Sequence, residues 1–186
     1  MSVLTSGRTE LSCRDNVGGV KNVYIFSYNP NTQFLLDGQN LISSDNTDSI
    51  YKFDVTNGNF NESITNDENG VLFRQNLSFR LLKQDLFTTK ELNDLTNFDF
   101  RYVVEFNSGV LKLCGLYNAA KVSSLTVNSG GTKQDFTGYD ISFESAEEIE
   151  SIYLSDLSLL TPQSINYIFE NNDNFIFQNG INYIFN

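Results

Sequence analysis

The sequence contains no histidine and no tryptophan, and only two prolines among its 186 residues. Without histidine the chain cannot form a Ser-His-Asp triad, a papain-like Cys-His pair or a histidine-ligated metal site. Tryptophan commonly stacks against sugar rings through its apolar face, so its absence disfavours a carbohydrate-binding or hydrolytic β-sandwich. These absences remove several enzyme classes before any motif is considered.

Positive charge and cysteine are also scarce. Lys and Arg total 12 against 23 Asp and Glu, which gives a net charge of −11. This charge argues against a protein that binds the phosphates of nucleic acid. Cys13 and Cys114 are the two cysteines, without a CxxC spacing, and we expect both to be small buried residues in a reducing compartment. No apolar run resembles a signal peptide or reaches the ~20 residues of a membrane span, so we expect a cytoplasmically made chain without a membrane partner.

Most of the chain has the pattern of antiparallel β structure, in which β-favouring segments alternate with turn residues. In the clearest segment Phe73, Gln75, Leu77, Phe79 and Leu81 alternate with the even-numbered residues 72 to 80. This period of two places one set of side chains on a core and the other towards solvent or a neighbour. Turns are expected at Asp37-Gly38, Asn57-Gly58, Asn107-Ser108-Gly109 and Asn128–Gly131, where glycine accepts positive φ. The expected strands are Val20–Tyr28, Gln33–Leu36, Leu41–Ile42, Ile50–Thr56, Asn59–Thr65, Val71–Gln84, Arg101–Phe106, Val110–Tyr117, Lys121–Val127 and Lys133–Glu144.

One short helix is expected over Thr89–Asn97, because Thr88 and Glu91 have the spacing of a capping box. A second capping-box spacing, Ser145–Glu148, is compatible with one or two helical turns or with a charged turn. The acidic run from Glu147 to Glu150 is interpreted as a solvated face. The predicted fold class is therefore mainly β, an antiparallel β-sandwich or barrel with one short packed helix.

The C-terminal segment holds a repeat with a period of eight residues. Each copy is Asn, an aromatic residue, Ile and Phe, followed by polar turn residues, which is typical of a meander of very short strands. We expect a main domain over residues 1–160 and a small β-repeat over residues 161–186. The aromatic residues of this repeat are Tyr167, Phe169, Phe175, Phe177, Tyr183 and Phe185.

No catalytic, cofactor or metal motif emerges from the sequence. The acidic segments Asp45–Asp48 and Asn66–Asn69 supply hard oxygen ligands, but neither has the spacing of a helix–loop–helix calcium site. The glycine pairs Gly18-Gly19 and Gly130-Gly131 lack a phosphate-loop pattern. We therefore expect a protein that is not an enzyme, with no cofactor.

The order of elements resembles that of the tail tube proteins of tailed bacteriophages, marine-phage type, over about Met1–Asp156. The resemblance is carried by the opening GRTELSCRDNVGGVKNVYIF (Gly7–Phe26), by GVLFRQNLSFRLL (Gly70–Leu82), by the helix and hairpin that follow, and by GYDISFE (Gly138–Glu144). It implies a structural virion protein of the tail, whose hexameric rings stack into a tube that conducts DNA during ejection. The implied partners are further copies of the chain, the tape measure protein, a possible sheath, the terminator and the baseplate.

The resemblance also implies a long hairpin that stacks one ring on the next. In this sequence the expected stacking hairpin is Ile50–Phe73, with Tyr51, Phe53, Phe60 and Phe73 as assembly residues. DNA would be only a transient cargo, repelled by an acidic lumen. Two alternatives stay open: another virion component, such as a tail terminator, baseplate or decoration protein, and a carbohydrate-binding β-sandwich.

Overall fold

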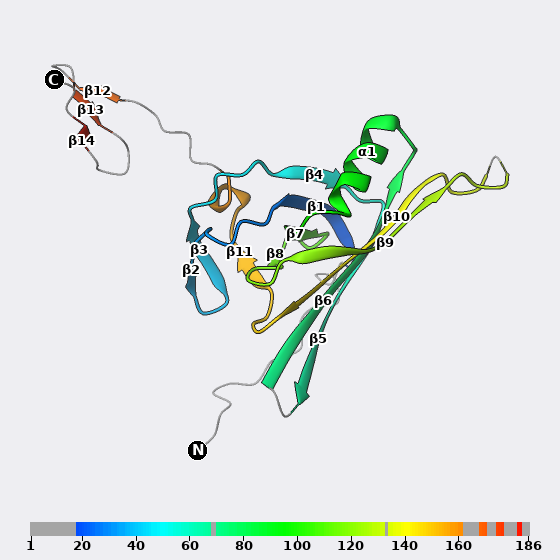
Figure 1. Cartoon of the computed structure of the whole chain (residues 1–186), viewed down its shortest axis with the longest axis horizontal. Coiled ribbons are helices and arrows are strands. Elements are labelled where there is room, and N and C mark those ends of the chain that lie inside the picture. The colour runs from blue at the N-terminus through cyan, green and yellow to red at the C-terminus, as the bar shows by residue number, and fades with distance from the viewer. Residues whose placement is uncertain are drawn as a thin grey trace.

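The computed structural model describes residues 18–67, 70–132 and 134–161, together with the backbone of 168–170, 174–176 and 182–183. It is mainly β with one α-helix, α1 (Leu86–Leu95), as the sequence predicts (Figure 1). One 3₁₀ turn spans Leu157–Leu159. The strands of the main sheet are β1 (Val20–Ser27), β2 (Phe34–Asp37), β3 (Asn40–Ser44), β4 (Tyr51–Asp54), β5 (Asn57–Asp67), β6 (Gly70–Leu82), β7 (Phe100–Phe106), β8 (Leu111–Cys114), β9 (Ala120–Asn128), β10 (Gly138–Glu147) and β11 (Ile152–Leu154).

The sheet branches at β7. One edge of β7 pairs with β1, which in turn pairs with β4. The opposite edge pairs with β8 over Tyr102–Glu105 and with β9 at Phe100 alone. From β8 the sheet continues through β11 and β3 to β2, and from β9 it continues through β10 and β6 to β5. The pairing of β11 with β3 is parallel, and the other pairings in this sheet are antiparallel.

Strands β1 and β7 form a central layer that is covered on both faces. The segment Phe100–Val104 is buried at every residue, because a strand between two cores has no solvent-facing side. The larger core lies between this layer, β6, β9, β10 and α1, whereas the smaller core includes residues of β3, β8, β11 and the 3₁₀ turn. The central layer thus joins two lobes, each with its own apolar core.

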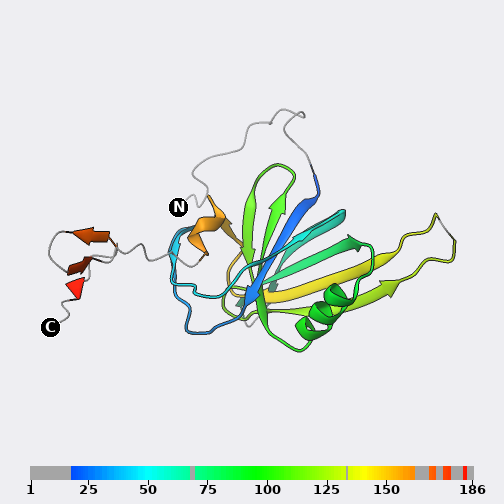
Figure 2. The same ribbon diagram turned by 90° about the horizontal axis from the view of Figure 1, so that it is seen from above.

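Two long hairpins extend the larger lobe in opposite directions, as Figures 1 and 2 show. The paired ends of β5 and β6, at Asp67 and Gly70, lie beyond Phe73 at one end of the sheet, and the β9–β10 hairpin extends beyond the other end, where Gly138 pairs with Leu82. In β6 the predicted alternation is confirmed, since Gln75, Leu77, Phe79 and Leu81 are buried while the residues between them are exposed.

Of three predicted turns, two are confirmed and one is wrong. The hairpin at Asp37-Gly38 is confirmed, as is the one closed by Gly109, with φ of +59° and +86° at the two glycines. The predicted turn at Asn57-Gly58 is wrong, because β5 begins at Asn57 and β4 pairs with β1 instead of β5. A Cβ atom on Gly58 would lie 2.7 Å from the Cβ atom of Val20, so a close approach of two strands requires this glycine.

The helix begins three residues earlier than predicted, and its cap differs. Asp85 is the N-cap residue, and its side chain accepts a hydrogen bond of 2.8 Å from the backbone N–H of Thr88. The capping box assigned to Thr88 is therefore wrong. Leu92 is buried against the larger core. Phe98 lies beyond the end of the helix and is exposed.

The C-terminal repeat forms a separate three-stranded antiparallel sheet, which confirms the predicted meander at the level of the backbone. Its strands are β12 (Ile168–Glu170), β13 (Asn174–Ile176) and β14 (Asn182–Tyr183). Phe169 pairs in register with Phe175, and Phe175 with Tyr183. The predicted residues Tyr167, Phe177 and Phe185 lie outside the described residues.

Candidate functional site

The sheet formed by β9, β10, β6 and β5 has a polar outer face and an apolar inner face. The inner face contributes Leu77, Phe79, Ile141 and Phe143 to the larger core. The outer face carries side chains at matching register positions, which form cross-strand rows of small amides and hydroxyls. Two such rows are Asn59, Ser78, Ser142 and Ser124, and Asn61, Asn76, Glu144 and Lys121.

Charges of both signs lie on this outer face. Arg74, Arg80 and Lys121 supply the positive charges of its strands, and Asp140 and Glu144 supply negative charges. The guanidinium Nε of Arg80 lies 2.5 Å from Oδ1 of Asp140, and the face is hollowed between them and Ser142. The face is therefore hydrophilic without a strong excess of either charge.

Among the described strands, neither edge of this four-stranded sheet has a partner over most of its length. In that part of the chain β5 pairs with β6 alone, and the edge of β9 opposite β10 pairs with β7 only at Ala120. Exposed strand edges carry unpaired backbone N–H and C=O groups, which readily pair with another chain. The geometry accordingly identifies two candidate assembly edges, at opposite sides of one sheet.

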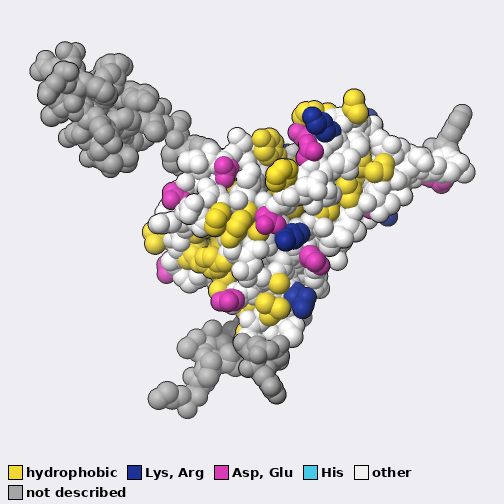
Figure 3. All heavy atoms as spheres, viewed as in Figure 1, with side chains coloured by type: hydrophobic (Ala, Val, Ile, Leu, Met, Phe, Trp, Pro, Cys, Tyr) yellow, Lys and Arg dark blue, Asp and Glu magenta, His cyan; other side chains and the backbone are white. Residues whose placement is uncertain are grey.

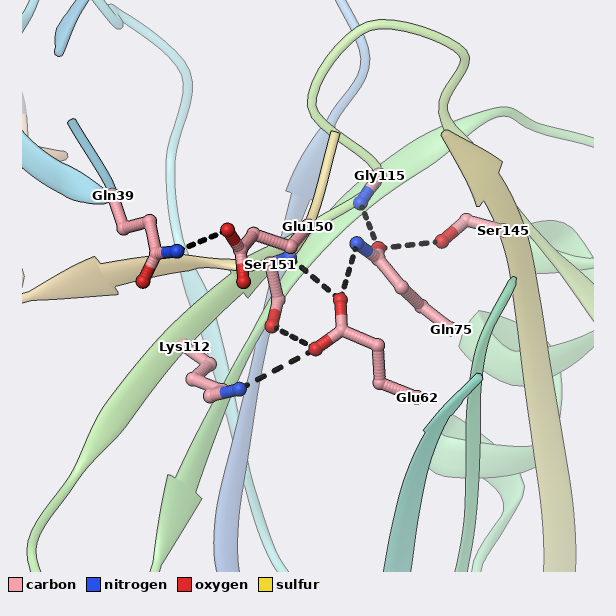
Figure 4. A network of polar contacts seen from close by, with 8 residues as sticks. All are labelled: Gln39, Glu62, Gln75, Lys112, Gly115, Ser145, Glu150 and Ser151. Atoms are coloured by element: carbon pink, nitrogen blue, oxygen red, sulfur yellow. Dashed lines mark hydrogen bonds and ion pairs between the residues drawn. The ribbon is translucent and has the colours of Figure 1, made fainter. Parts of the chain in front are cut away.

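A polar network ties β5 to strands of both lobes (Figure 4). The Glu62 carboxylate on β5 accepts hydrogen bonds from the backbone N–H and the hydroxyl of Ser151, at 2.6 and 2.7 Å, and forms an ion pair with Lys112 at 3.4 Å. Gln75 donates to Glu62 and accepts from the backbone N–H of Gly115 at 3.1 Å. A carboxylate engaged in this way positions strands instead of acting as an acid or a base.

The pKa of Glu62 agrees with this structural role. Its partial burial alone would raise the pKa, but the hydrogen bonds from Ser151 and the charge of Lys112 outweigh burial and lower it below its ordinary value. In the same network the side chain of Gln39 donates a hydrogen bond to Glu150 (Figure 4).

Glu147 and Arg101 are a second pair of charged residues, both buried. The Glu147 carboxylate accepts hydrogen bonds from the backbone N–H groups of Tyr117 and Asn118 at 3.0 to 3.2 Å. Burial raises its pKa, and these hydrogen bonds and the Arg101 charge offset the increase only in part. The prediction of a solvated face is therefore wrong at Glu147.

Arg101 is held by carbonyl oxygens and aromatic rings. Its guanidinium donates to the Leu116 carbonyl at 3.0 Å and to the Asn29 carbonyl at 3.1 Å. The guanidinium carbon lies 4.3 Å from the ring centre of Tyr28 and 4.9 Å from that of Phe34, so both rings contribute cation–π contacts. Glu62, Arg101 and Glu147 themselves line none of the three pockets described on the surface.

A third carboxylate, Glu105 on β7, binds three side chains of β1. Lys21, Asn22 and Tyr24 each donate a hydrogen bond to it, at 2.8, 2.7 and 2.7 Å. Burial opposes ionisation, but these donors together lower the pKa of Glu105 to about 2. The cluster reinforces the β1–β7 pairing and leaves the carboxylate permanently ionised near neutral pH.

A metal-ligand cluster and a reactive cysteine are two further kinds of functional site that the described ranges could contain. No cluster of three or more potential ligands occurs among those residues. Cys114 is buried, and burial raises the pKa of its thiol far above neutrality, so it is not a reactive thiolate. No helix in the part of the chain that the structure describes is long and apolar enough to cross a membrane.

The four predicted assembly residues do not form one hairpin. Tyr51 and Phe53 lie on β4, whereas Phe60 and Phe73 lie on β5 and β6. Phe53 and Phe60 pack against the larger core, and the Phe60 ring makes an edge contact with Phe106 at a centroid distance of 5.8 Å. Tyr51 is exposed, so a role in assembly stays a prediction for these residues and is best supported for Tyr51.

Sequence reasoning missed the inward placement of Glu147, although a signal for it exists. The alternation of Ile141 and Phe143 continues through Ser145 to Glu147, so extending the strand would have placed Glu147 inside. The burial of Arg101 had a weaker signal, its position within an almost wholly apolar strand.

Comparisons with family models, with curated proteins and with solved structures find no match to this chain.

Proposed function

We propose that this protein is the structural subunit of a tube, as in the tail tubes of tailed bacteriophages, and that it has no catalytic activity. The short strings and element order that resemble tail tube proteins support this proposal, as does the mainly β fold with one packed helix. The observation that carries it is the four-stranded sheet with one polar face and two edges that no described strand covers over most of their length.

Strand direction favours closure of this sheet into a ring. The order β5, β6, β10, β9 is antiparallel at every step, so β5 and β9 run in opposite directions. Rotation of the subunit about an axis roughly along the strands preserves strand direction and keeps the same face inward. The β9 edge of one copy therefore meets the β5 edge of the next in antiparallel orientation, and a closed ring of such sheets has no free edge.

In this arrangement the polar outer face of the four strands would line the lumen. Its side chains are mainly amides and hydroxyls, with three cations and two carboxylates on β6, β9 and β10. This composition supports a near-neutral lumen more than the acidic lumen that the net charge suggested. A hydrophilic wall without a strong excess of positive charge would still let DNA pass as a transient cargo, because few phosphates would be neutralised.

The half-buried polar networks suit a subunit that must keep its shape. Glu62 and Gln75 connect the lumen sheet to β8 and to Ser151, and Glu105 connects β1 to β7. The tail tube proposal also implies hexameric rings and contacts with a tape measure protein, a terminator, a baseplate and possibly a sheath. In that setting the chain would reside in the virion tail.

Negative-stain electron microscopy of the purified full chain at high concentration tests the proposal. We expect rings or hollow tubes of uniform width without any added ligand. Single rings that never stack would favour a terminator or another virion component. A stable monomer that binds sugars would contradict the proposal and favour the carbohydrate-binding alternative.

A further inference from the structure

An apolar groove lies between the C-terminal half of α1 and strands β4 and β1, away from the polar face of the four-stranded sheet. Its volume is about 350 Å³. The apolar side chains of Phe53, Leu95 and Phe98 line it, together with Tyr51 and Ile25. Phe98 is 67% exposed and Tyr51 is 58% exposed, so two large aromatic side chains in this groove are left in contact with water.

The rim of this groove is acidic. Glu91, Asp94 and Asp99 belong to its lining. Asp99 forms an ion pair with Lys121 at 3.6 Å. Glu91 and Asp94 take part in none of the ion pairs of the described residues. Lys52, on the neighbouring strand, is paired with Asp54 at 2.7 Å. Hydrophobic, acidic and basic side chains are seen close together near α1 in Figure 3.

The helix adds to this negative potential. Carbonyl groups at the C-terminus of a helix carry a partial negative charge, and cations are favoured there. The last turn of α1 has no basic residue, and Asp94 lies in that turn with Asp99 a few residues further on. Glu91 and Asp94, which take part in no ion pair among the described residues, therefore favour the approach of a cation.

A free strand edge completes the site. β4 pairs with β1 along one edge, and no described strand pairs with the other edge. An extended peptide could add to this edge through its main chain, with alternate side chains directed into the groove.

From these observations we propose that the groove between α1 and β4 binds an extended segment of a partner protein in which apolar residues alternate with lysine or arginine. The acidic rim selects the basic residues, the aromatic walls take up the apolar ones, and β4 supplies backbone hydrogen bonds. This groove lies on α1, β4 and β1, whereas the edges proposed for ring closure are those of β5 and β9; Asp99 of its lining is paired with Lys121 of β9.

The test uses the full chain and a fluorescein-labelled peptide, acetyl-Lys-Val-Lys-Phe-Lys-Val-Lys-amide, with fluorescence anisotropy as the readout. We expect Glu91→Gln combined with Asp94→Asn to weaken binding at least tenfold and to reduce its salt dependence. Phe98→Ala should weaken binding at least fivefold. A peptide N-methylated at alternate residues should bind at least fivefold more weakly, because main-chain donors are lost.

Matched controls keep this test specific. Phe87→Ala removes an exposed aromatic residue of the same helix outside the groove, and Asp37→Asn combined with Glu148→Gln removes two exposed charges elsewhere. Both controls should bind the peptide within twofold of the unmodified protein. Circular dichroism checks that every variant is folded.

Three results would overturn the proposal. The first is that a peptide with glutamate in place of every lysine binds as tightly as the lysine peptide. The second is an equal effect of the groove variants and their controls. The third is a dimer in sedimentation experiments that Phe98→Glu dissociates, since the groove would then belong to a second copy of the chain.

Discussion

The carboxylate of Glu62 accepts two hydrogen bonds from Ser151, a residue 89 positions away in the chain, at 2.6 Å from its backbone nitrogen and 2.7 Å from its hydroxyl. This contact fixes the first strand of the long β5–β6 hairpin to the segment that leads into β11. Lys112 on β8 completes the attachment at 3.4 Å. One carboxylate thus holds three segments that no short-range pattern links.

Replacing Glu62 with alanine should lower the free energy of unfolding by about 1–3 kcal/mol, because the Ser151 donors and the Lys112 charge lose their acceptor. Urea denaturation measures the effect. Ser63→Ala, on the other face of the same strand, is the control and should change stability by less than about 0.5 kcal/mol. Equal effects of the two substitutions would show that the Glu62 network contributes nothing specific.

Removing the Arg101 side chain should cost about 3–5 kcal/mol of unfolding free energy, since Glu147 would remain as a buried charge without its nearby cation. The cost of Arg101→Ala should be smaller in a Glu147→Gln background. A double-mutant cycle by chemical denaturation measures this coupling. Additive effects would mean that the two buried charges do not interact.

Glu105 and Glu147 should influence the pH dependence of stability in opposite directions. The pKa of Glu105 is lowered from 4.5 to about 2, so its ionised form stabilises the fold, and this stabilisation is lost as the pH falls from about 4.5 to about 2. Glu105→Gln should therefore flatten the stability profile in that window. Glu148→Gln, an exposed control, should keep the slope of the unmodified protein.

For Glu147 the sign is reversed, because its pKa is raised above 4.5 in the folded protein. The folded state holds its proton more tightly than the unfolded state, so this group contributes less stability as the pH rises above about 4.5. The stability of Glu147→Gln relative to the unmodified protein should increase over that range. A difference that does not change with pH would contradict the assignment of Glu147 as a buried, ionisable group.

Strand β9 offers a direct test of the proposed ring closure. Its pairing with β10 skips one residue, so Ser123 lies at a β-bulge, a position where proline is tolerated. Ser123→Pro should leave the isolated subunit folded and should abolish rings and tubes in electron micrographs. Ser123→Ala keeps the backbone N–H and should assemble normally; tubes formed by the proline variant would exclude the β9 edge as the joint.

Much of the fold follows from patterns within a few residues. The alternation from Gln75 to Leu81 determines which face of β6 is buried, and the glycines at 38 and 109 determine where two hairpins turn. The eight-residue spacing of the C-terminal repeat likewise predicts its short strands. Such features depend on side-chain spacing and on backbone dihedral preference, and both are local.

Only the tertiary structure decides which strands become neighbours and which edges stay open. β4 has the alternation expected of a hairpin partner for β5, yet it pairs with β1. Val23 and Ile25 of β1 are buried in the larger core, and they lie opposite Phe53 and Tyr51 of β4. The inward position of Glu147 depends on donors at Tyr117 and Asn118, some 30 residues away. The sequence by itself determined the elements and their apolar faces, whereas long-range pairing and burial decided the edges, the charge networks and the groove beside α1.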